Sequence, residues 1–279
     1  FRARLGGRMN IAQRYVGAVL LAAVLGGVAW CAVAQDYPSK PIRFVVPTPP
    51  GGFLDILARV IGQKLSENWG QPVVVENRTG GGITIGSNVV ATAAPDGYTV
   101  LVVPPDFAIN PSLYAKLPYD TLKDFAPVTL VTWGPSVLVV HPSVPARSVK
   151  ELVELAKSKP GQLNYASAGN GSGGHLAMEL FKTMAGVDLA HVPYRGLGPA
   201  VIDLVSGNVS VMFAQLAAVR RHVDAGKLRA LGVAGKQRSQ AMPDLPTVAE
   251  SGLVGFDVNP WFGIVAPGGT PKNIGSSRK

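Results

Sequence analysis

Short β-branched runs alternate along this chain with stretches whose apolar residues recur at helical spacing, and this alternation constrains the fold most. The runs are mostly continuous, which is typical of strands buried on both faces of a parallel sheet. Between them, positions such as Leu54, Leu57, Ile61 and Leu65 mark an apolar helix face. The pattern predicts an α/β fold with mostly parallel sheets flanked by helices. Strands are expected at residues 42–46, 73–75, 99–103, 128–131, 137–140, 163–166, 189–192, 209–213 and 228–233, and helices near 54–65, 149–157, 177–184, 200–205 and 216–225.

Residues 1–34 are predicted to form a secretory signal peptide that is cleaved after Ala34. An uncharged run from Tyr15 to Gln35 follows Arg14 and contains the small-residue sequence Ala-Val-Ala at 32–34. The alternatives are a membrane anchor, disfavoured by the pair Gly26-Gly27 and by the Ala-Val-Ala site, and a lipoprotein site at Cys31, disfavoured by the bulky Trp30 before it. The expected product is a soluble protein exported to a bacterial periplasm.

The basic balance of the chain does not indicate a nucleic-acid partner. There are 26 Lys and Arg residues against 17 Asp and Glu, but Arg2, Arg4, Arg8 and Arg14 lie in the predicted leader. Cys31 is the single cysteine, so the mature chain would have neither thiol chemistry nor a disulfide.

The length after cleavage favours two lobes rather than one, because it exceeds a typical α/β unit. Trp133, Gly134 and Pro135 interrupt two strand-like runs and mark the most plausible change of lobe. We therefore expect lobe 1 at residues 35–131, lobe 2 at 132–256 and a return segment to lobe 1 at 257–279.

Three glycine-rich turns, each placed after a strand, form the best candidate site. They lie at residues 49–55, 79–84 and 169–174. Glycines let a ligand approach the backbone, and the N–H groups of a following helix attract anions. Any one of these turns could be a plain connection, but ligands of open α/β sheets bind at the carboxyl ends of strands, where all three are expected.

Catalytic and cofactor chemistry is thinly represented. Gly169, Gly171 and Gly174 match the dinucleotide fingerprint, yet the next strand ends in Pro193-Tyr194-Arg195 without the acidic residue that would hold a ribose. The four histidines are scattered without metal-ligand spacing. We expect no cofactor, no metal and no enzymatic activity.

Several motifs in a fixed order resemble the tripartite tricarboxylate transporter substrate-binding receptors, also called Bug receptors. The similarity runs over roughly residues 37–272. Its motifs are Pro-Pro-Gly-Gly at 49–52 with Asp55-x-x-Ala58-Arg59, Val75-Glu76-Asn77-Arg78, Ala94-Pro95-Asp96-Gly97-Tyr98-Thr99, Ile109-Asn110-Pro111, Leu117-Pro118-Tyr119-Asp120, Tyr165-Ala166-Ser167-Ala168-Gly169, His175-Leu176-Ala177, Val192-Pro193-Tyr194-Arg195-Gly196 and Asp244-Leu245-Pro246-Thr247.

The resemblance implies a monomeric periplasmic receptor with two lobes of the Venus-flytrap type. Such a receptor closes on a small carboxylate and delivers it to a permease made of a large and a small integral membrane subunit. A sensor for a membrane signalling partner would use the same fold, and an exported enzyme acting on a carboxylate is the more distant alternative. By position, the ligand loops would include Gly51, Gly52, Phe53, Asp55, Gly81, Gly82, Ile83, Thr84, Asp106, Ser172, Gly173, Gly174, His175, Tyr194, Arg195, Gly196 and Gln215.

Two departures from the family pattern carry expectations of their own. The family usually has a small hydroxyl residue after Gly-Gly, where this chain has Phe53. We therefore hypothesise a more apolar carboxylate such as an aromatic acid, with a short dicarboxylate as the main competitor. The alternative is that the Phe53 ring turns into the core. The sequence Thr270-Pro271 is typical of a helix start, but few residues follow it. A truncated lobe 1 with exposed apolar surface is therefore expected.

Overall fold

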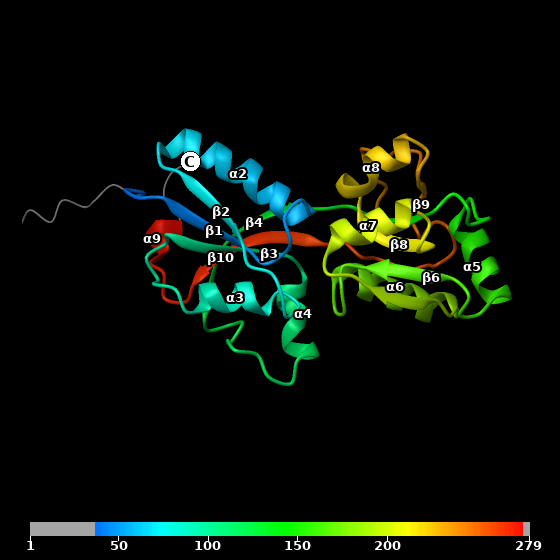
Figure 1. Cartoon of the computed structure of the whole chain (residues 1–279), viewed down its shortest axis with the longest axis horizontal. Helices are drawn as coiled ribbons and strands as arrows, with labels where there is room; N and C mark the ends of the chain where they lie inside the picture. Colours follow the sequence, from blue (N-terminus) through cyan, green and yellow to red (C-terminus); the bar gives the residue numbers. More distant parts are fainter. Residues whose placement is uncertain (1–36, 276–279) are drawn as a thin grey trace, which may run out of the picture. The chain divides into compact units, whose positions relative to one another are not determined.

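The computed structural model describes residues 37–275, so the predicted signal peptide at residues 1–34 lies outside the described range. From Lys40 onward the described residues belong to one compact unit. That unit contains two five-stranded sheets, each with helices packed on it (Figure 1). In the part of the chain that is described, no helix is long and apolar enough to cross a membrane.

The first sheet has the strand order β2-β1-β3-β10-β4. Its parallel part is β1 paired with β2 on one side and with β3 on the other, whereas β10 runs antiparallel to both β3 and β4. Its strands are β1 (Ile42–Val46), β2 (Val73–Asn77), β3 (Thr99–Val103), β4 (Phe125–Trp133) and β10 (Trp261–Pro267), and the helices in the same segments are α2 (Phe53–Trp69), α3 (Thr84–Ala91), α4 (Asp106–Leu113) and the short α9 (Lys272–Gly275).

The second sheet repeats this plan with the order β7-β6-β8-β5-β9. Strand β6 pairs in parallel with β7 and β8, and β5 runs antiparallel to β8 and β9. Its elements are β5 (Ser136–Val140), α5 (Val149–Ser158), β6 (Asn164–Ser167), α6 (Gly173–Ala185), β7 (Ala190–Pro193), α7 (Leu197–Val205), β8 (Val211–Gln215), α8 (Leu216–Asp224) and β9 (Arg229–Val233).

The strand β5 of the second lobe is covered by helices on both faces, which accounts for its continuous apolar sequence. Leu138 and Val140 of β5 face a core shared with α5 and α6, while Val137 and Val139 face a separate core shared with α7 and α8. All four side chains are fully buried. A strand that is covered on both faces gains from apolar side chains at every position, so the period-2 alternation is lost. The two-lobe α/β prediction is confirmed, with each sheet mixed because one of its strands runs against the others.

Two crossings connect the lobes, one from β4 to β5 and one into β10. At the first crossing Gly134 lies against an aromatic ring: a Cβ built there would stand 2.8 Å from Phe262 Cε2. No other residue fits this position without moving the ring. Through β10 the chain returns to the first sheet between β3 and β4, so the C-terminal segment pairs with strands from the N-terminal part of the chain.

Candidate ligand-binding site

A cavity of about 630 Å³ is lined by residues of both lobes, a size ordinary for small-molecule sites. The beginnings of α2, α3, α4, α6, α7 and α8 all contribute to its wall. Helix N-termini carry free backbone N–H groups and a partial positive charge. Moreover, the N-caps of α2, α3, α7 and α8 make no side-chain capping hydrogen bond. The cavity therefore suits an anionic ligand without a cluster of cationic side chains.

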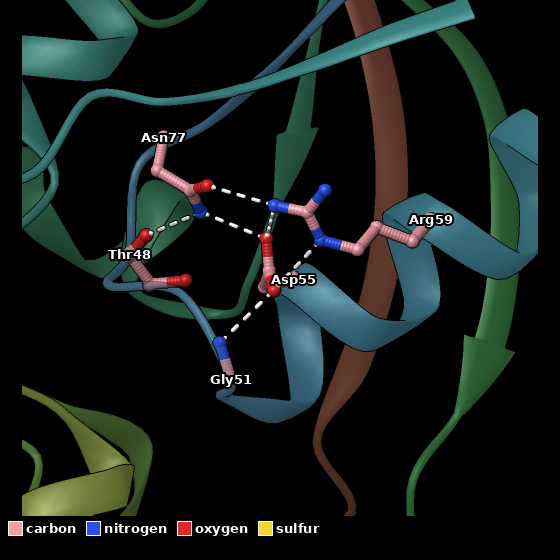
Figure 2. A network of polar contacts seen from close by, with 5 residues as sticks. All are labelled: Thr48, Gly51, Asp55, Arg59 and Asn77. Atoms are coloured by element: carbon pink, nitrogen blue, oxygen red, sulfur yellow. Dashed lines mark hydrogen bonds and ion pairs between the residues drawn. The ribbon is translucent and has the colours of Figure 1, made fainter.

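The first glycine turn is held by a buried carboxylate. Figure 2 shows Asp55 accepting hydrogen bonds from the Gly51 backbone N–H at 2.9 Å, from Arg59 at 2.9 and 3.0 Å, and from Asn77 Nδ2 at 2.9 Å. Asn77 Nδ2 also donates to the Thr48 carbonyl at 3.0 Å. The network ties the loop before α2 to the end of β2.

Burial opposes the ionisation of Asp55, but the hydrogen bonds from Arg59, Gly51 and Asn77 outweigh it and lower the pKa of this carboxyl. The Asp55 side chain is thus fully engaged with the protein, and neither Asp55 nor Gly51 lines the cavity, whereas Gly52 and Phe53 do. Asp55 shapes the loop from behind.

The second turn reaches the cavity through Gly81, Gly82 and Ile83. Ile83 adopts a left-handed φ of 72° directly before α3, a conformation that is costly for a β-branched residue. The turn is braced by Asn110 of α4, whose Nδ2 donates to the Gly82 carbonyl at 2.8 Å. Thr84 is turned away: its hydroxyl donates to the Gly81 carbonyl at 2.8 Å, and the residue does not line the cavity.

The third turn contributes Ser172, Gly173 and Gly174 at the start of α6. Ser172 is the N-cap and accepts a hydrogen bond from the His175 backbone N–H. Gly174 packs so closely that an added Cβ would stand 2.8 Å from the Phe213 carbonyl oxygen. His175 itself is absent from the cavity wall.

Among the described residues that line the cavity, two have charged side chains, Asp106 and Arg195. Burial raises the pKa of Asp106 to about 6, against hydrogen bonds from its own backbone N–H and from Gly173 N–H. The carboxylate of α4 therefore already engages the first N–H of α6. Arg195 is exposed. Nearby, Tyr194 donates to Asp203 at 2.6 Å, and burial together with this bond raises its pKa to about 12.

Replacing Asp106 with asparagine is expected to stabilise the protein at neutral pH. Because the pKa of Asp106 is raised above its ordinary value of 3.8, the folded state favours the protonated form, and the stability linked to this group falls as pH rises from about 4 to about 6. Asp106→Asn removes that loss, about 3 kcal/mol, and keeps an acceptor for Gly173. Melting temperatures at pH 4.5 and 7.5 measure the effect.

The matched control is Asp188→Asn, since Asp188 is an exposed acid with 67% of its side-chain surface accessible. It is expected to leave the melting temperature unchanged at both pH values. A loss of stability at pH 7.5 in Asp106→Asn would contradict the assigned environment of Asp106.

One side of the cavity is aromatic. Phe53, at the start of α2, and Phe262, on β10, pack with their ring centroids 4.6 Å apart, and both rings line the cavity. Phe53 is half-buried, so its ring both packs on the first lobe and faces the ligand space. Thr48 adds a polar group to this wall, and its buried hydroxyl has no hydrogen-bond partner among the described residues.

The structure brings most of the sequence-predicted residues together and leaves four aside. Those lining the cavity are Gly52, Phe53, Gly81, Gly82, Ile83, Asp106, Ser172, Gly173, Gly174, Tyr194, Arg195, Gly196 and Gln215, and those outside the lining are Gly51, Asp55, Thr84 and His175. Sequence reasoning missed Thr48, Tyr114, Asn170 and Phe262. Thr48 directly precedes the glycine turn at 49–55 and Asn170 lies within the turn at 169–174, so both could have been named from those turns. Tyr114 and Phe262 carry no such signal.

Two α/β lobes with helix N-termini converging on one cavity define a two-lobe solute-binding protein. Residues 57–277 match the model of the tripartite tricarboxylate transporter family receptor. The chain belongs to this family. Members are substrate-binding receptors, and carboxylates are bound in solved structures of the family.

Individual relatives agree with this assignment. The protein BugT of Bordetella pertussis is 41% identical over 250 residues, which cover 89% of this chain and 77% of BugT. The solved structure of Rpa4515 from R. palustris with adipate has a TM-score of 0.85 at 40% identity, covering 87% of this chain and 81% of that one. MatC of Rhodopseudomonas palustris with bound malate gives a TM-score of 0.80 at 37% identity, covering 86% and 82%.

Proposed function

We propose that this chain is a periplasmic receptor that binds a small carboxylate with an apolar body between its lobes and delivers it to a permease in the membrane. The observation that carries the proposal is the composition of the cavity wall. Backbone N–H groups at the uncapped N-termini of α2, α3, α7 and α8 supply its positive potential. A carboxylate matches these groups in charge and in hydrogen-bonding capacity.

The two ends of such a ligand would engage different lobes. Gly52 is the N-cap and Phe53 the first residue of α2 in the first lobe, and Gly196 is the N-cap of α7 in the second lobe with Gly198 in its first turn. A ligand that contacts both sets of N–H groups stabilises the closed arrangement, because the open one can satisfy only one set. Adipate in Rpa4515 and malate in MatC support a carboxylate here.

The Phe53 and Phe262 rings favour a ligand that is apolar between or beside its carboxylates. Contact with these rings removes apolar surface from water, at about 25 cal/mol per Å². A short, highly hydrated diacid such as succinate would gain little from this wall, whereas adipate or benzoate would gain more. The family assignment supports the permease as the partner and the periplasm as the location.

Calorimetric titration with succinate, adipate and benzoate tests the ligand class. We expect adipate or benzoate to bind about tenfold more tightly than succinate, and Phe53→Ser to reduce this preference. Ile56→Ser is the matched control, since Ile56 lies on the same helix with 55% of its surface exposed, and it should leave the preference intact. Binding of succinate as tightly as adipate, together with no binding of benzoate, would contradict the proposal.

A further inference from the structure

His175 lies behind the glycine turn at residues 169–172 and not in the cavity wall. Its Nδ1 accepts a hydrogen bond from the Gly171 backbone N–H at 3.1 Å. The same turn presents Gly169, Asn170 and Ser172 to the cavity. An imidazole nitrogen can accept only when it is unprotonated, so this contact requires the neutral ring with its proton on Nε2.

The turn that His175 holds also meets the other lobe. Gly171 is buried with a φ of 77°, and a Cβ built on it would collide with the Leu113 side chain of α4. The position favours glycine for its backbone conformation, and an added Cβ would also require the exposed Leu113 side chain to move. A shift of Gly171 would alter the cavity wall and the contact between the lobes together.

A second histidine fixes the ring of the first. The rings of His175 and His191 stack with centroids 4.2 Å apart and an interplanar angle of 20°, and Tyr165 stacks on His191 at 4.7 Å. His191 Nε2 lies 2.7 Å from Ser167 Oγ. That hydroxyl also accepts from Gly169 N–H and lies 3.1 Å from the Gly169 carbonyl.

Ser167 has all its hydrogen bonds when His191 donates from Nε2, because the hydroxyl then accepts twice and donates once to the Gly169 carbonyl. In this arrangement His191 fixes Gly169, and His175 fixes Gly171. The two histidines thus hold both ends of the turn from behind.

We propose that His175 is a positioning residue for ligand binding, whose neutral ring keeps the turn at residues 169–172 in its binding shape; this inference rests on the proposed function of the cavity. Protonation would turn the Nδ1 acceptor into a donor that faces the Gly171 N–H. The loop would then lose its support as the ring gains its charge.

The surroundings of His175 keep the ring neutral at physiological pH. Burial lowers its pKa from the ordinary value of 6.5; Glu179 on the same helix opposes this, and Lys182 adds to it. From β7, His191 faces the ring at stacking distance. From β6, Tyr165 donates to Glu179 at 2.6 Å, which also pairs with Lys182 at 3.0 Å. The loss of support is therefore expected below pH 6.5.

Amide hydrogen exchange of the turn tests the proposal without any ligand. At pH 7.5, His175→Leu is expected to lower the protection of the Gly171 amide about tenfold, the effect of one lost hydrogen bond. His175→Asn is expected to retain protection, since Asn Oδ1 can stand in for Nδ1. In the unsubstituted protein, protection should fall as His175 becomes protonated below pH 6.5, and in His175→Asn it should not.

The second arm of the test is calorimetric titration at pH 7.5 with whichever of succinate, adipate and benzoate binds the unsubstituted protein most tightly. His175→Leu should bind this acid about tenfold more weakly. His175→Asn should bind it as tightly as the unsubstituted protein does. Protection of Gly171 that stays constant while the His175 ring becomes protonated, as followed by NMR of the same sample, would overturn the proposal, as would equal loss of protection in the two variants at unchanged melting temperature. If no acid binds, the proposed function fails while the exchange arm still decides the role of His175.

Discussion

Gly173→Leu is expected to abolish carboxylate binding while the protein stays folded. Gly173 begins α6 and lines the cavity, and no atom lies within 4 Å of a Cβ built on it. A leucine side chain can therefore extend into the cavity, where it would fill ligand space. We expect the dissociation constant to rise at least 100-fold, equivalent to about 2.7 kcal/mol of binding free energy, as measured by calorimetry with adipate or benzoate.

The adjacent glycine supplies the contrast. Gly174→Ala places a Cβ 2.8 Å from the Phe213 carbonyl oxygen, so this small substitution should lower the melting temperature, whereas Gly173→Leu should not. Gly173→Ala is the matched mild variant and should fold normally. Undiminished binding of the tightest acid by Gly173→Leu would show that the ligand does not occupy this cavity.

Asp55→Ala is expected to cost the largest share of stability among single substitutions at the site. It removes the acceptor for Gly51 N–H, Asn77 and Arg59 from a side chain that is only 4% exposed. Hydrogen bonds to a charged group contribute about 1.5–3 kcal/mol each. Arg59, with 53% of its side chain exposed, can return to water, so the net loss should be about 2–4 kcal/mol by urea unfolding.

Glu67→Ala is the control for Asp55, because Glu67 is an acid on the exposed part of the same helix, paired with Lys64. It should change stability by less than about 0.5 kcal/mol. Since the pKa of Asp55 is lowered, its contribution is present above pH 3.8 and is lost as pH falls through the folded-state pKa. Equal stability of Asp55→Ala and the unsubstituted protein at pH 7 would contradict the bracing role.

The strands were predictable wherever both faces are covered. Residues 42–46, 99–103 and 137–140 are continuous apolar runs in the sequence and match β1, β3 and most of β5. Helix α2 was predictable from its apolar face. Helix α4 was not, because it is short and contains Pro111. Strand β10 was missed because its place in the sheet depends on its pairing with β3 and β4, and both of these strands are distant from β10 in the sequence.

The cavity was predictable where glycine turns follow strands, and not where side chains arrive from elsewhere. Phe262 reaches Phe53 only because β10 enters the first sheet antiparallel, and no local pattern encodes that. The sequence motifs assigned Asp55 and His175 to the ligand loops, whereas both residues lie outside the cavity lining. The motifs could not reveal that both side chains turn toward their own loops, since that depends on Gly51, Asn77 and Gly171 as partners.

Paired titrations with acids and their uncharged amides test the central claim, that helix N-termini in the cavity select a carboxylate. Adipate would be compared with adipamide, and benzoate with benzamide, by calorimetry at pH 7.5. Each pair has nearly the same shape and apolar surface but differs in charge. We predict saturable binding of at least one acid with one site per chain, and no measurable binding of its amide. Equal binding of acid and amide, or binding of neither in both pairs, would contradict the account.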